Sequence, residues 1–437
     1  MNKVIYENTK VPIKLWLDDI EEGALNQAKN AANLPFAYHH IAIMPDAHQG
    51  YGVSIGTVLA TEGVVIPNAV GVDIGCGMCA VKTTLKVEQL DKETLKKIMG
   101  KIREVIPVGF EHRKLAQDER LMPPFTKHLH TAPKYFEKYI IGKEYSSALK
   151  QIGTLGGGNH FIEIQKEVLK CDNCNGKGEI NTDDLGSYMP CLKCNKTGKN
   201  NDLNSNIWIT IHSGSRNLGY KVAKYYNDLA IELNKKWYSS IPKEWELAFL
   251  PIETQEAKDY MREMQYCVDF ALANRKLMMD KIIEIFETFY QLYRQPIVAE
   301  EMINIAHNYA IWENHYGKNI IIHRKGATLA RKGTIGIIPG SIGSKSYIIK
   351  GLGNLNSFQS CSHGAGRKLG RKAACKTLNL EEEIKKLDDQ GIIHGLRNQT
   401  DLDEATSAYK NIDTVMKNQE DLVEIITELH PIAVIKG

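Results

Sequence analysis

The sequence predicts a fold of mixed helices and strands, in which the strands are short and mostly buried. Apolar runs separated by glycine-containing turns fill residues 35–90, a pattern typical of buried strands joined by tight turns. The apolar tail 431–437 also resembles a strand, and we expect it to be packed and not frayed. Further apolar runs that end in polar, glycine-containing turns lie at 207–217, 319–328 and 337–347.

Helical patterns occupy the other long segments. Residues 11–34 carry apolar side chains at roughly helical spacing, and 91–150 is polar and mainly helical between its prolines. Residues 218–314 are largely helical, and a stripe of apolar side chains between Glu256 and Tyr293 has the spacing of a helix packed on a core. We therefore expect 218–314 to be a helical excursion within a larger domain.

The composition is that of an ordinary globular protein, because 43% of the 437 residues are hydrophobic and 24% are charged. The formal net charge of +3 is too small to indicate a nucleic-acid ligand. Evidence for nucleic-acid binding must therefore come from local clusters of basic residues. The first residues contain no apolar signal segment, and no stretch is long enough to cross a bilayer. Nine cysteines without an obvious disulfide pattern fit a reducing compartment, so we expect a cytoplasmic protein with no membrane partner.

Asp73 and Cys76 lie three residues apart, between glycines, inside an apolar run. A tight turn there would bring the carboxylate and the thiolate to one cation, since borderline metal ions accept both donors. Taken alone, a buried structural cysteine beside a turn-capping aspartate explains the pair better. That explanation loses ground when the histidines downstream are counted, among them His160 and His212, although a lone histidine such as His307 is more often structural.

A separate pattern consists of two CxxC pairs, each followed by a glycine: Cys171 with Cys174, and Cys191 with Cys194. Four thiolates at this spacing suit tetrahedral zinc, and the glycine amides can donate hydrogen bonds to the sulfur atoms. A redox dithiol is the weaker interpretation, because two matched pairs fit a metal better. Since 166–205 is polar and separates two strand-like motifs, we expect it to be an inserted zinc-binding module.

Several turns are suited to phosphate. Ser213, Ser215 and Arg216 follow a strand and could form a phosphate-binding turn, although capping of the next helix explains the serines equally well. Arg324 and Lys325 begin the sharpest basic cluster, which could also be a solvated loop. With the candidate metal ligands, these turns indicate metal-dependent phosphoryl or nucleotidyl transfer. The residues alone do not identify which histidine would be a nucleophile.

Taken together, eight motifs in one order resemble the RtcB family of GTP-dependent RNA ligases. The resemblance covers nearly the whole chain except 166–205, and the terminal residues 435–437 fit as well. The matching runs are residues 45–50, 71–77, 156–163, 212–216, 307–309, 323–328, 339–341 and 363–367.

This resemblance implies a single α+β domain over 1–437, with strands around a deep central cleft for metal and nucleotide. It implies two Mn²⁺ ions bridged by the thiolate of Cys76. The other protein ligands would be Asp73, His160, His212 and His307. His363 would attack the α-phosphate of GTP and become guanylylated. Guanylate would be held by Asn159, His160, Phe161, Ile162, Glu163, His307, Asn308, Pro339, Gly340, Ser341, Ile342, Ser346, His363, Gly364, Ala365, Gly366 and Lys436.

The resemblance also implies the reaction. The guanylyl group would pass to an RNA 3′-phosphate, and an RNA 5′-hydroxyl would then displace GMP and seal the strand in tRNA splicing or RNA repair. A 2′,3′-cyclic phosphate end would first be opened to the 3′-phosphate, and some members of the family use an archease-like activator. Candidates for contacts with RNA phosphates are Arg216, Arg324, Lys325 and Arg367.

Two other classes of function stay open. A metal-dependent phosphodiesterase that opens cyclic phosphates without ligation would use the same metal donors but would not need His363 or Lys436. A non-catalytic RNA-binding protein would not need Asp73, Cys76 and the histidines together.

Two hypotheses describe the role of the predicted zinc-binding module. It could staple the scaffold, or it could clamp RNA ends, and the second is slightly favoured because lysines surround the cysteine pairs. Those lysines are Lys170, Lys177, Lys193, Lys196 and Lys199.

Overall fold

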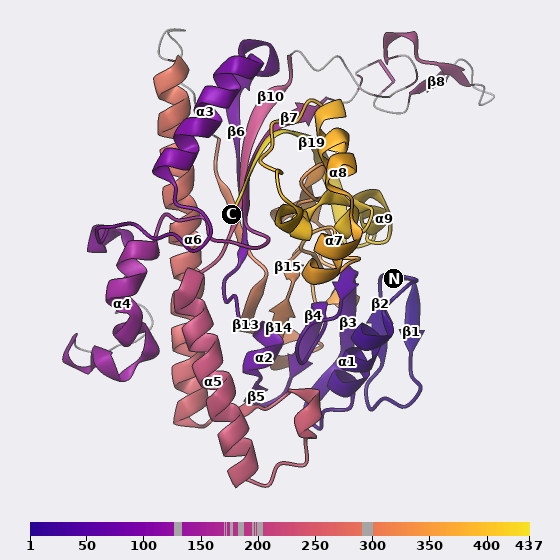
Figure 1. Cartoon of the computed structure of the whole chain (residues 1–437). Coiled ribbons are helices and arrows are strands. Elements are labelled where there is room, and N and C mark those ends of the chain that lie inside the picture. Colours follow the sequence, from indigo (N-terminus) through magenta and orange to yellow (C-terminus); the bar gives the residue numbers. More distant parts are fainter. Residues whose placement is uncertain are drawn as a thin grey trace.

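The computed structural model describes residues 1–125, 133–169, 171, 173–174, 178–181, 188–194, 196, 198, 204–290 and 300–437. Two large, mainly antiparallel sheets form its frame, and helices cover their outer faces (Figure 1). The chain is thus of the α+β class, as predicted. Of the helices within these ranges, none has both the length and the apolar character needed to cross a membrane.

The first sheet has seven strands, and every neighbouring pair is antiparallel. It curls into a nearly closed barrel, inside which Met78, Trp208 and Ile337 pack together. Its outer face is covered by α3 (Lys92–Val105) and α6 (Gln255–Tyr290). The strand order is β12 (Ile303–Ala306), β6 (Gly77–Lys86), β10 (Asn206–Ser213), β7 (Phe161–Val168), β19 (Val423–Lys436), β17 (Ser346–Gly351) and β16 (Ile335–Ile338).

The second sheet has six strands and lies beside the barrel. Only its β2–β3 pair is parallel. One face packs on α1 (Glu22–Ala32), and the other packs on α9 (Ile412–Lys417). The strand order is β1 (Lys3–Ile5), β2 (Ile13–Leu15), β3 (Ala37–His48), β4 (Ile55–Thr61), β14 (Lys318–Lys325) and β13 (Asn308–His315).

The remaining helices form two groups (Figure 1). α4 (Ile140–Gln151) and α5 (Arg216–Lys236) pack with α6 on one side of the molecule. The others are α2 (Pro67–Val70), α7 (Arg371–Thr377) and α8 (Leu380–Asp389). Three two-stranded sheets pair β5 (Val64–Val65) with β11 (Leu250–Pro251), β15 (Ala327–Leu329) with β18 (Ser360–Ser362), and β8 (Glu179–Asn181) with β9 (Tyr188–Pro190).

The structure corrects two helix predictions. Within 11–34, only α1 is helical, and Ile13 and Leu15 belong to a strand because both side chains are buried on one face of the sheet. Within the described residues of 218–314, helix is confined to α5 and α6 apart from a short 3₁₀ turn, and 303–306 and 308–315 are strands. The side chains of Ile303 and Ile305, two residues apart, both pack inside the barrel, as in a strand. The helical spacing of the apolar residues that precede them therefore does not continue into this segment.

The fold also places the apolar tail and the four cysteines of the CxxC pairs. The apolar tail is the last part of β19, which pairs with β7 so that Lys436 lies opposite Phe161. The four zinc-candidate cysteines lie between β7 and β10, together with the β8–β9 hairpin. Figure 1 shows this hairpin projecting away from the barrel at the far end of β7 and β10. Lys170, Lys177 and Lys199 lie outside the described residues.

Candidate active site

One edge of the barrel gathers the predicted metal ligands. Cys76 precedes β6, His160 precedes β7, His212 is close to the end of β10, and His307 follows β12. Because these neighbouring strands are antiparallel, the start of one strand lies beside the end of the next. The register places His212 opposite Phe161, and it places Gly77 opposite both Ser213 and Ala306. Residues from four distant parts of the sequence thereby meet at one place.

A tight turn brings Asp73 to the same edge, as predicted. The backbone N–H of Cys76 donates to the carbonyl oxygen of Asp73 at 3.1 Å. Gly75 between them has a φ of +73°, and a Cβ atom there would lie only 2.8 Å from Cα of Val268 in α6. A side chain at position 75 would therefore strain the turn and collide with the helix backbone.

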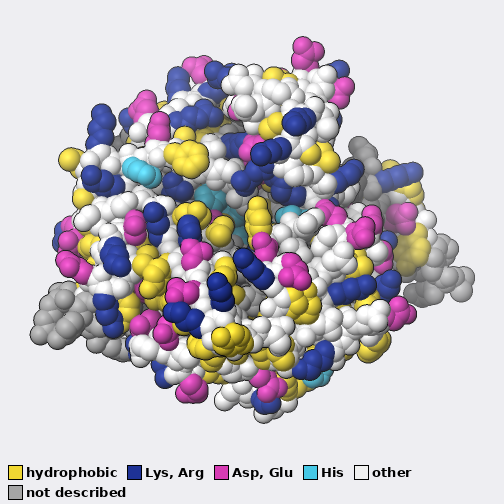
Figure 2. All heavy atoms as spheres, turned by 60° about the horizontal axis from the view of Figure 1, so that its bottom comes forward, with side chains coloured by type: hydrophobic (Ala, Val, Ile, Leu, Met, Phe, Trp, Pro, Cys, Tyr) yellow, Lys and Arg dark blue, Asp and Glu magenta, His cyan; other side chains and the backbone are white. Residues whose placement is uncertain are grey.

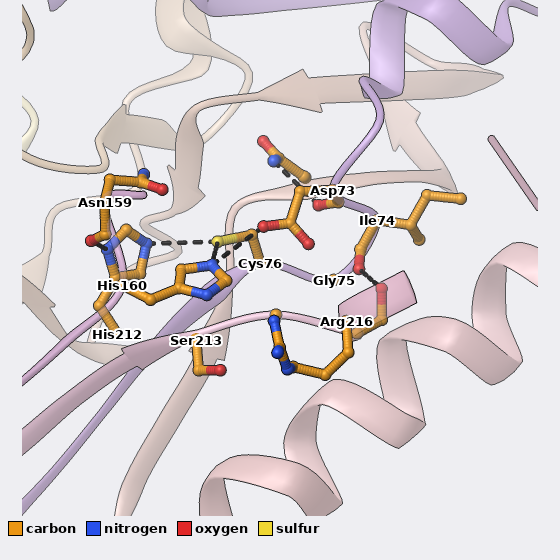
Figure 3. Close-up of polar contacts among 12 residues, drawn as sticks. Asp73, Ile74, Gly75, Cys76, Asn159, His160, His212, Ser213 and Arg216 are labelled. Carbon is orange, nitrogen blue, oxygen red and sulfur yellow. Dashed lines mark hydrogen bonds and ion pairs between the residues drawn. The ribbon is translucent and has the colours of Figure 1, made fainter. Parts of the chain in front are cut away.

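Two groups of donor atoms converge at this edge. Figure 3 shows the side chains of Asp73, Cys76, His160 and His212 among them. Sγ of Cys76 lies 3.3 Å from Nε2 of His212 and 3.5 Å from Nε2 of His160. Nε2 of His160 lies 3.1 Å from Oδ2 of Asp73, and Nε2 of His212 lies 3.4 Å from Nε2 of His307. Cys76 belongs to both groups, and within each group the donor atoms lie within 4.8 Å of one another.

The imidazole rings are oriented for ligation through Nε2. Nδ1 of His160 lies 3.0 Å from the carbonyl oxygen of Leu155, and Nδ1 of His212 lies 3.0 Å from that of Asn159. A carbonyl oxygen only accepts, so the proton sits on Nδ1 and the lone pair of Nε2 points at Cys76. Burial lowers the pKa of His212 and His307 well below the ordinary value, which favours the neutral, ligating form.

The chemistry of the donor set fits bound cations. Burial and the neighbouring Asp73 carboxylate raise the pKa of the Cys76 thiol well above its usual range. A thiolate at this position therefore needs positive charge beside it, and a coordinated metal ion supplies that charge. Carboxylate, thiolate and imidazole together suit borderline ions such as manganese, cobalt and zinc. The two overlapping groups provide donors for a pair of ions that share one sulfur.

His363 follows β18 and is held on its Nδ1 side. Oδ2 of Asp46 in β3 lies 2.6 Å from Nδ1 of His363 and accepts the backbone N–H of His363 at 3.0 Å. The ring centroid of His363 lies 4.7 Å from that of His307. Because Nδ1 is committed to Asp46, Nε2 is the ring nitrogen available to the space beside the metal-donor edge.

A cavity of about 900 Å³ joins His363 to the metal-donor edge. Figure 2 shows a hollow on this face with histidine side chains in it and lysine and arginine side chains around it. Nearly all predicted site residues line this cavity: Asp73, Cys76, Asn159, His160, Phe161, His212, His307, Asn308, Pro339, Gly340, Ser341, Ile342, His363, Gly364, Ala365, Gly366 and Lys436.

Three residues predicted to hold guanylate do not line the cavity. The side chain of Ile162 is fully buried in the hydrophobic core under α3 and α6, which leaves only its backbone near the site. Glu163 and Ser346 are buried in the barrel and are linked by Gln165, whose Nε2 donates to Oε2 of Glu163 at 2.7 Å and to Oγ of Ser346 at 3.0 Å.

Of the four basic residues predicted to contact RNA phosphates, two line the cavity and two do not. Arg324 is wrong as an RNA contact, because its side chain is 0% exposed and is neutralised by Glu313 inside the six-stranded sheet. Arg216 is largely buried and donates to Thr154 and to the carbonyl oxygen of Gly109. Lys325 and Arg367 do line the cavity, although burial lowers the pKa of Lys325 to about 7.

Sequence reasoning missed three partners of the predicted residues. Asp46 lies within the matching run 45–50, but no role is predicted for it from the sequence. A carboxylate inside an apolar strand was a usable signal. The only signal for Gln165 was that it lies two residues after Glu163 in β7, so that both polar side chains are on the same face of the strand. Asp403, which forms an ion pair with Lys436, lies in a segment without any sequence signal.

The four cysteines of the zinc-binding module form a separate donor group, and all four are buried. Sγ of Cys171 lies 3.8 Å from Sγ of Cys191, and Sγ of Cys174 lies 3.6 Å from Sγ of Cys194. The amide of Gly178 donates to Cys174 at 3.2 Å, and the amide of Gly198 donates to Cys194 at 3.3 Å. The predicted glycine amide–sulfur bonds are thus present.

The fold and the site together define a class of proteins in which a nearly closed barrel holds two overlapping donor groups around one shared thiolate. The chain belongs to the RtcB family, since the family model described as tRNA-splicing ligase RtcB matches residues 27–437. The chain is 36% identical over 448 aligned residues to RNA-splicing ligase RtcB of Escherichia coli strain K12, covering all of both chains. It is 31% identical to tRNA-splicing ligase RtcB of Nanoarchaeum equitans over 100% of this chain and 98% of that one.

Proposed function

We propose that this protein is an RNA ligase that joins RNA ends bearing a 3′-phosphate or a 2′,3′-cyclic phosphate to ends bearing a 5′-hydroxyl. It uses GTP and Mn²⁺ and acts through a guanylylated His363. The single observation that carries the proposal is the position of His363, which is oriented by Asp46 and shares one cavity with both donor groups. Membership of a family of RNA-splicing ligases supports the same activity.

In the first step, Nε2 of His363 attacks the α-phosphorus of GTP. The N–P bond forms while the bond from that phosphorus to the bridging oxygen breaks, and pyrophosphate leaves with the electron pair. The hydrogen bond from Nδ1–H to Asp46 keeps the lone pair on Nε2, and the Asp46 carboxylate stabilises the positive charge that develops on the ring. Asp46 is therefore a positioning residue for the nucleophile.

In the later steps, an oxygen of the RNA 3′-phosphate attacks the phosphorus held by His363. The N–P bond breaks, so the ring regains its lone pair and the RNA end carries the guanylyl group. The 5′-hydroxyl oxygen of the second RNA then attacks the phosphorus of the 3′-phosphate and loses its proton to solvent. The bond from that phosphorus to the GMP oxygen breaks, and GMP leaves with the electron pair. Splitting the ligation in this way gives each attack a good leaving group.

Two Mn²⁺ ions would be held by Asp73, Cys76 and His160 on one side, and by Cys76, His212 and His307 on the other. Bound there, they would supply charge neutralisation and polarisation of phosphate oxygens. Neutral imidazoles with Nδ1–H fixed on backbone carbonyls suit this role, because their Nε2 lone pairs already point at the shared sulfur.

We also propose that the cysteine module binds one structural zinc ion. A tetrahedral ion with Zn–S bonds of about 2.3 Å requires S···S separations of about 3.8 Å. The separations of 3.8 Å and 3.6 Å match that requirement and are too long for disulfide bonds. Metal binding would also hold together a module whose core, among its described residues, consists of the four cysteines and Ile180.

The decisive experiment is labelling with GTP radioactive at the α-phosphate. The purified protein is incubated with Mn²⁺ and labelled GTP, denatured and separated by electrophoresis. We expect an acid-labile label on the wild type and on a His430→Ala control, whose ring lies outside the cavity, and none on His363→Ala. Absence of label on folded, Mn-loaded wild type would refute the ligase mechanism, and opening of cyclic-phosphate RNA would then indicate a phosphodiesterase.

A further inference from the structure

Phe110 is displayed to solvent beside the candidate active site. Among the described residues it is the most exposed large hydrophobic side chain, at 97%. It lies in the connection between α3 and α4. A phenyl ring left in water forgoes the free energy that burial would provide.

The turn that carries Phe110 is held rigidly. The N–H of Leu155 donates to the carbonyl oxygen of Pro107 at 2.9 Å, and the N–H of Gly109 donates to that of Gly156 at 2.9 Å. The N–H of Glu111 closes the turn onto Val108 at 3.2 Å. The exposure of the ring is therefore imposed by an anchored backbone and does not come from a loose loop.

Two arginines reinforce the anchoring from either side. Arg216 donates to the carbonyl oxygen of Gly109 at 3.0 Å, just before Phe110. Arg113, just after it, donates its backbone N–H to Lys150 at 3.0 Å and its guanidinium to Gly153 at 2.7 Å. Residues 109–113 are thus held against the glycine-rich turn that leads to His160.

That glycine-rich turn connects the cavity lining to the turn that carries Phe110. A Cβ atom built on Gly157 would lie 3.4 Å from Cα of Gly109, so the backbones of the two turns are in contact. Gly158 lines the cavity together with Arg371, whose guanidinium lies 2.7 Å from the position of a Cβ on Gly158. Gly157 and Gly158 thus lie between Arg371, at the cavity, and Gly109, the residue before Phe110.

We infer that Phe110 is a stacking platform for a base of the single-stranded RNA end that enters the cavity, while Arg371 contacts its phosphate. This inference rests on the proposed function. Single-stranded RNA ends carry unstacked bases that aromatic side chains recognise without sequence preference. Arg371 forms an ion pair with Glu404 through Nε at 3.0 Å, and its guanidinium is still half-exposed. Lys368 and Lys372 also line the cavity, so the positive charge there exceeds that of Glu404 and suits a phosphate backbone better than an apolar partner.

The test measures RNA affinity and guanylylation separately. Phe110→Ala is expected to weaken binding of a short 3′-phosphate RNA oligonucleotide by about 10-fold, the order that loss of one base–aromatic stack produces. Phe110→Trp should retain wild-type affinity. Labelling of His363 with GTP alone should be the same in all variants, because the ring lies outside the nucleotide site.

Leu115→Ala is the matched control, because Leu115 lies in the same connection and is 79% exposed but offers no aromatic face. Wild-type affinity in Phe110→Ala would overturn the inference, as would an equal loss in Leu115→Ala, which would indicate a general apolar surface. If wild type binds RNA through Phe110 but is not labelled by GTP, the ligase proposal fails and the platform stands.

Discussion

Oδ2 of Asp46 lies 2.6 Å from Nδ1 of His363 and also accepts the backbone N–H groups of His363 and Gly364, at 3.0 Å and 3.3 Å. One carboxylate oxygen thus fixes both the ring and the turn that carries it. Asp46 belongs to the six-stranded sheet, whereas the candidate metal donors lie at one edge of the barrel. This contact therefore sets the position of the proposed nucleophile relative to the metal donors.

Asp46→Asn should slow guanylylation of His363 by about 100-fold or more, the usual scale for a lost proton-positioning group. Asparagine keeps the shape of the side chain but can turn an N–H toward Nδ1, which then holds the lone pair in place of Nε2. The measurement is the single-turnover labelling rate with Mn²⁺ and α-labelled GTP. Asp228→Asn on the surface of α5 is the control, and a wild-type rate in folded Asp46→Asn would contradict the positioning role.

Cys76→Ala should abolish binding of both metal ions, because Cys76 is the only donor shared by the two groups. His307→Ala removes a donor from one group only and should retain one ion per chain. The readout is the manganese content of protein equilibrated with Mn²⁺ and freed of excess ion.

Cys79→Ala is the matched control for this comparison. Cys79 is also a buried cysteine near the start of β6, but it faces the hydrophobic core under α6. We expect it to bind both ions. Full manganese content in Cys76→Ala would show that the sulfur does not bridge the sites.

Glu263→Gln should change how stability depends on pH. Burial raises the pKa of Glu263 to about 7 from an ordinary 4.5, and its carboxyl accepts from Tyr226 and from the N–H of Ile141. Between those values the folded state holds a proton that the unfolded state has lost, so wild-type stability falls as pH rises through this window, by up to about 1.4 kcal/mol per pH unit. The glutamine variant lacks this dependence.

Denaturant unfolding of both proteins at pH 5 and pH 7 checks this prediction. The stability of wild type relative to Glu263→Gln should be greater at pH 5. Parallel behaviour of the two proteins would mean that Glu263 is ionised at both pH values in the folded state.

Some of the candidate metal donors could be predicted from local marks, whereas His307 bears none and was assigned only through the resemblance to the family. Cys76 sits among glycines, His160 follows three of them, and His212 ends an apolar run. Such marks identify strand ends, and antiparallel pairing brings strand ends together. The order of the strands in the barrel was beyond sequence reasoning, because it depends on contacts between residues hundreds of positions apart.

Contacts across the fold explain the failures. Arg324 looks like a surface cation in sequence, but Glu313 on the neighbouring strand neutralises it in the interior. Ile303 and Ile305 follow a long helix, yet pairing with β6 makes their segment a strand. In each case a distant partner decides the outcome, and no local propensity encodes that partner.

The zinc-binding module lies at the wrong end of its strands to clamp RNA ends at the active site. β10 spans eight residues from Asn206, next to the module, to Ser213, next to His212. At a rise of about 3.3 Å per residue, the module begins about 25 Å from the metal donors. Residues 166–205 also contain six lysines and six acidic residues, so the module has no excess positive charge.

Replacing the module with a short hairpin turn should therefore leave both guanylylation and RNA affinity unchanged. Lys166 and Ile207 are cross-strand partners, so a few turn residues can join Val168 to Ser205 without disturbing β7 or β10. RNA affinity is measured with the same oligonucleotide for the full chain and the shortened one. A clear loss of affinity in the shortened chain would restore the clamp hypothesis.

Cys191→Ser should release the zinc ion and destabilise only the module. The β8–β9 hairpin projects from the barrel, and its core contains no large apolar side chain besides Ile180 among the residues that the structure describes there. Without metal, that core cannot offset the entropy of ordering the loop. We expect about one zinc ion per chain in wild type and none in the variant, with new protease cleavage within 169–205. Cys375→Ser, outside both clusters, should keep its zinc and its resistance, and zinc retained by Cys191→Ser would refute the four-thiolate site.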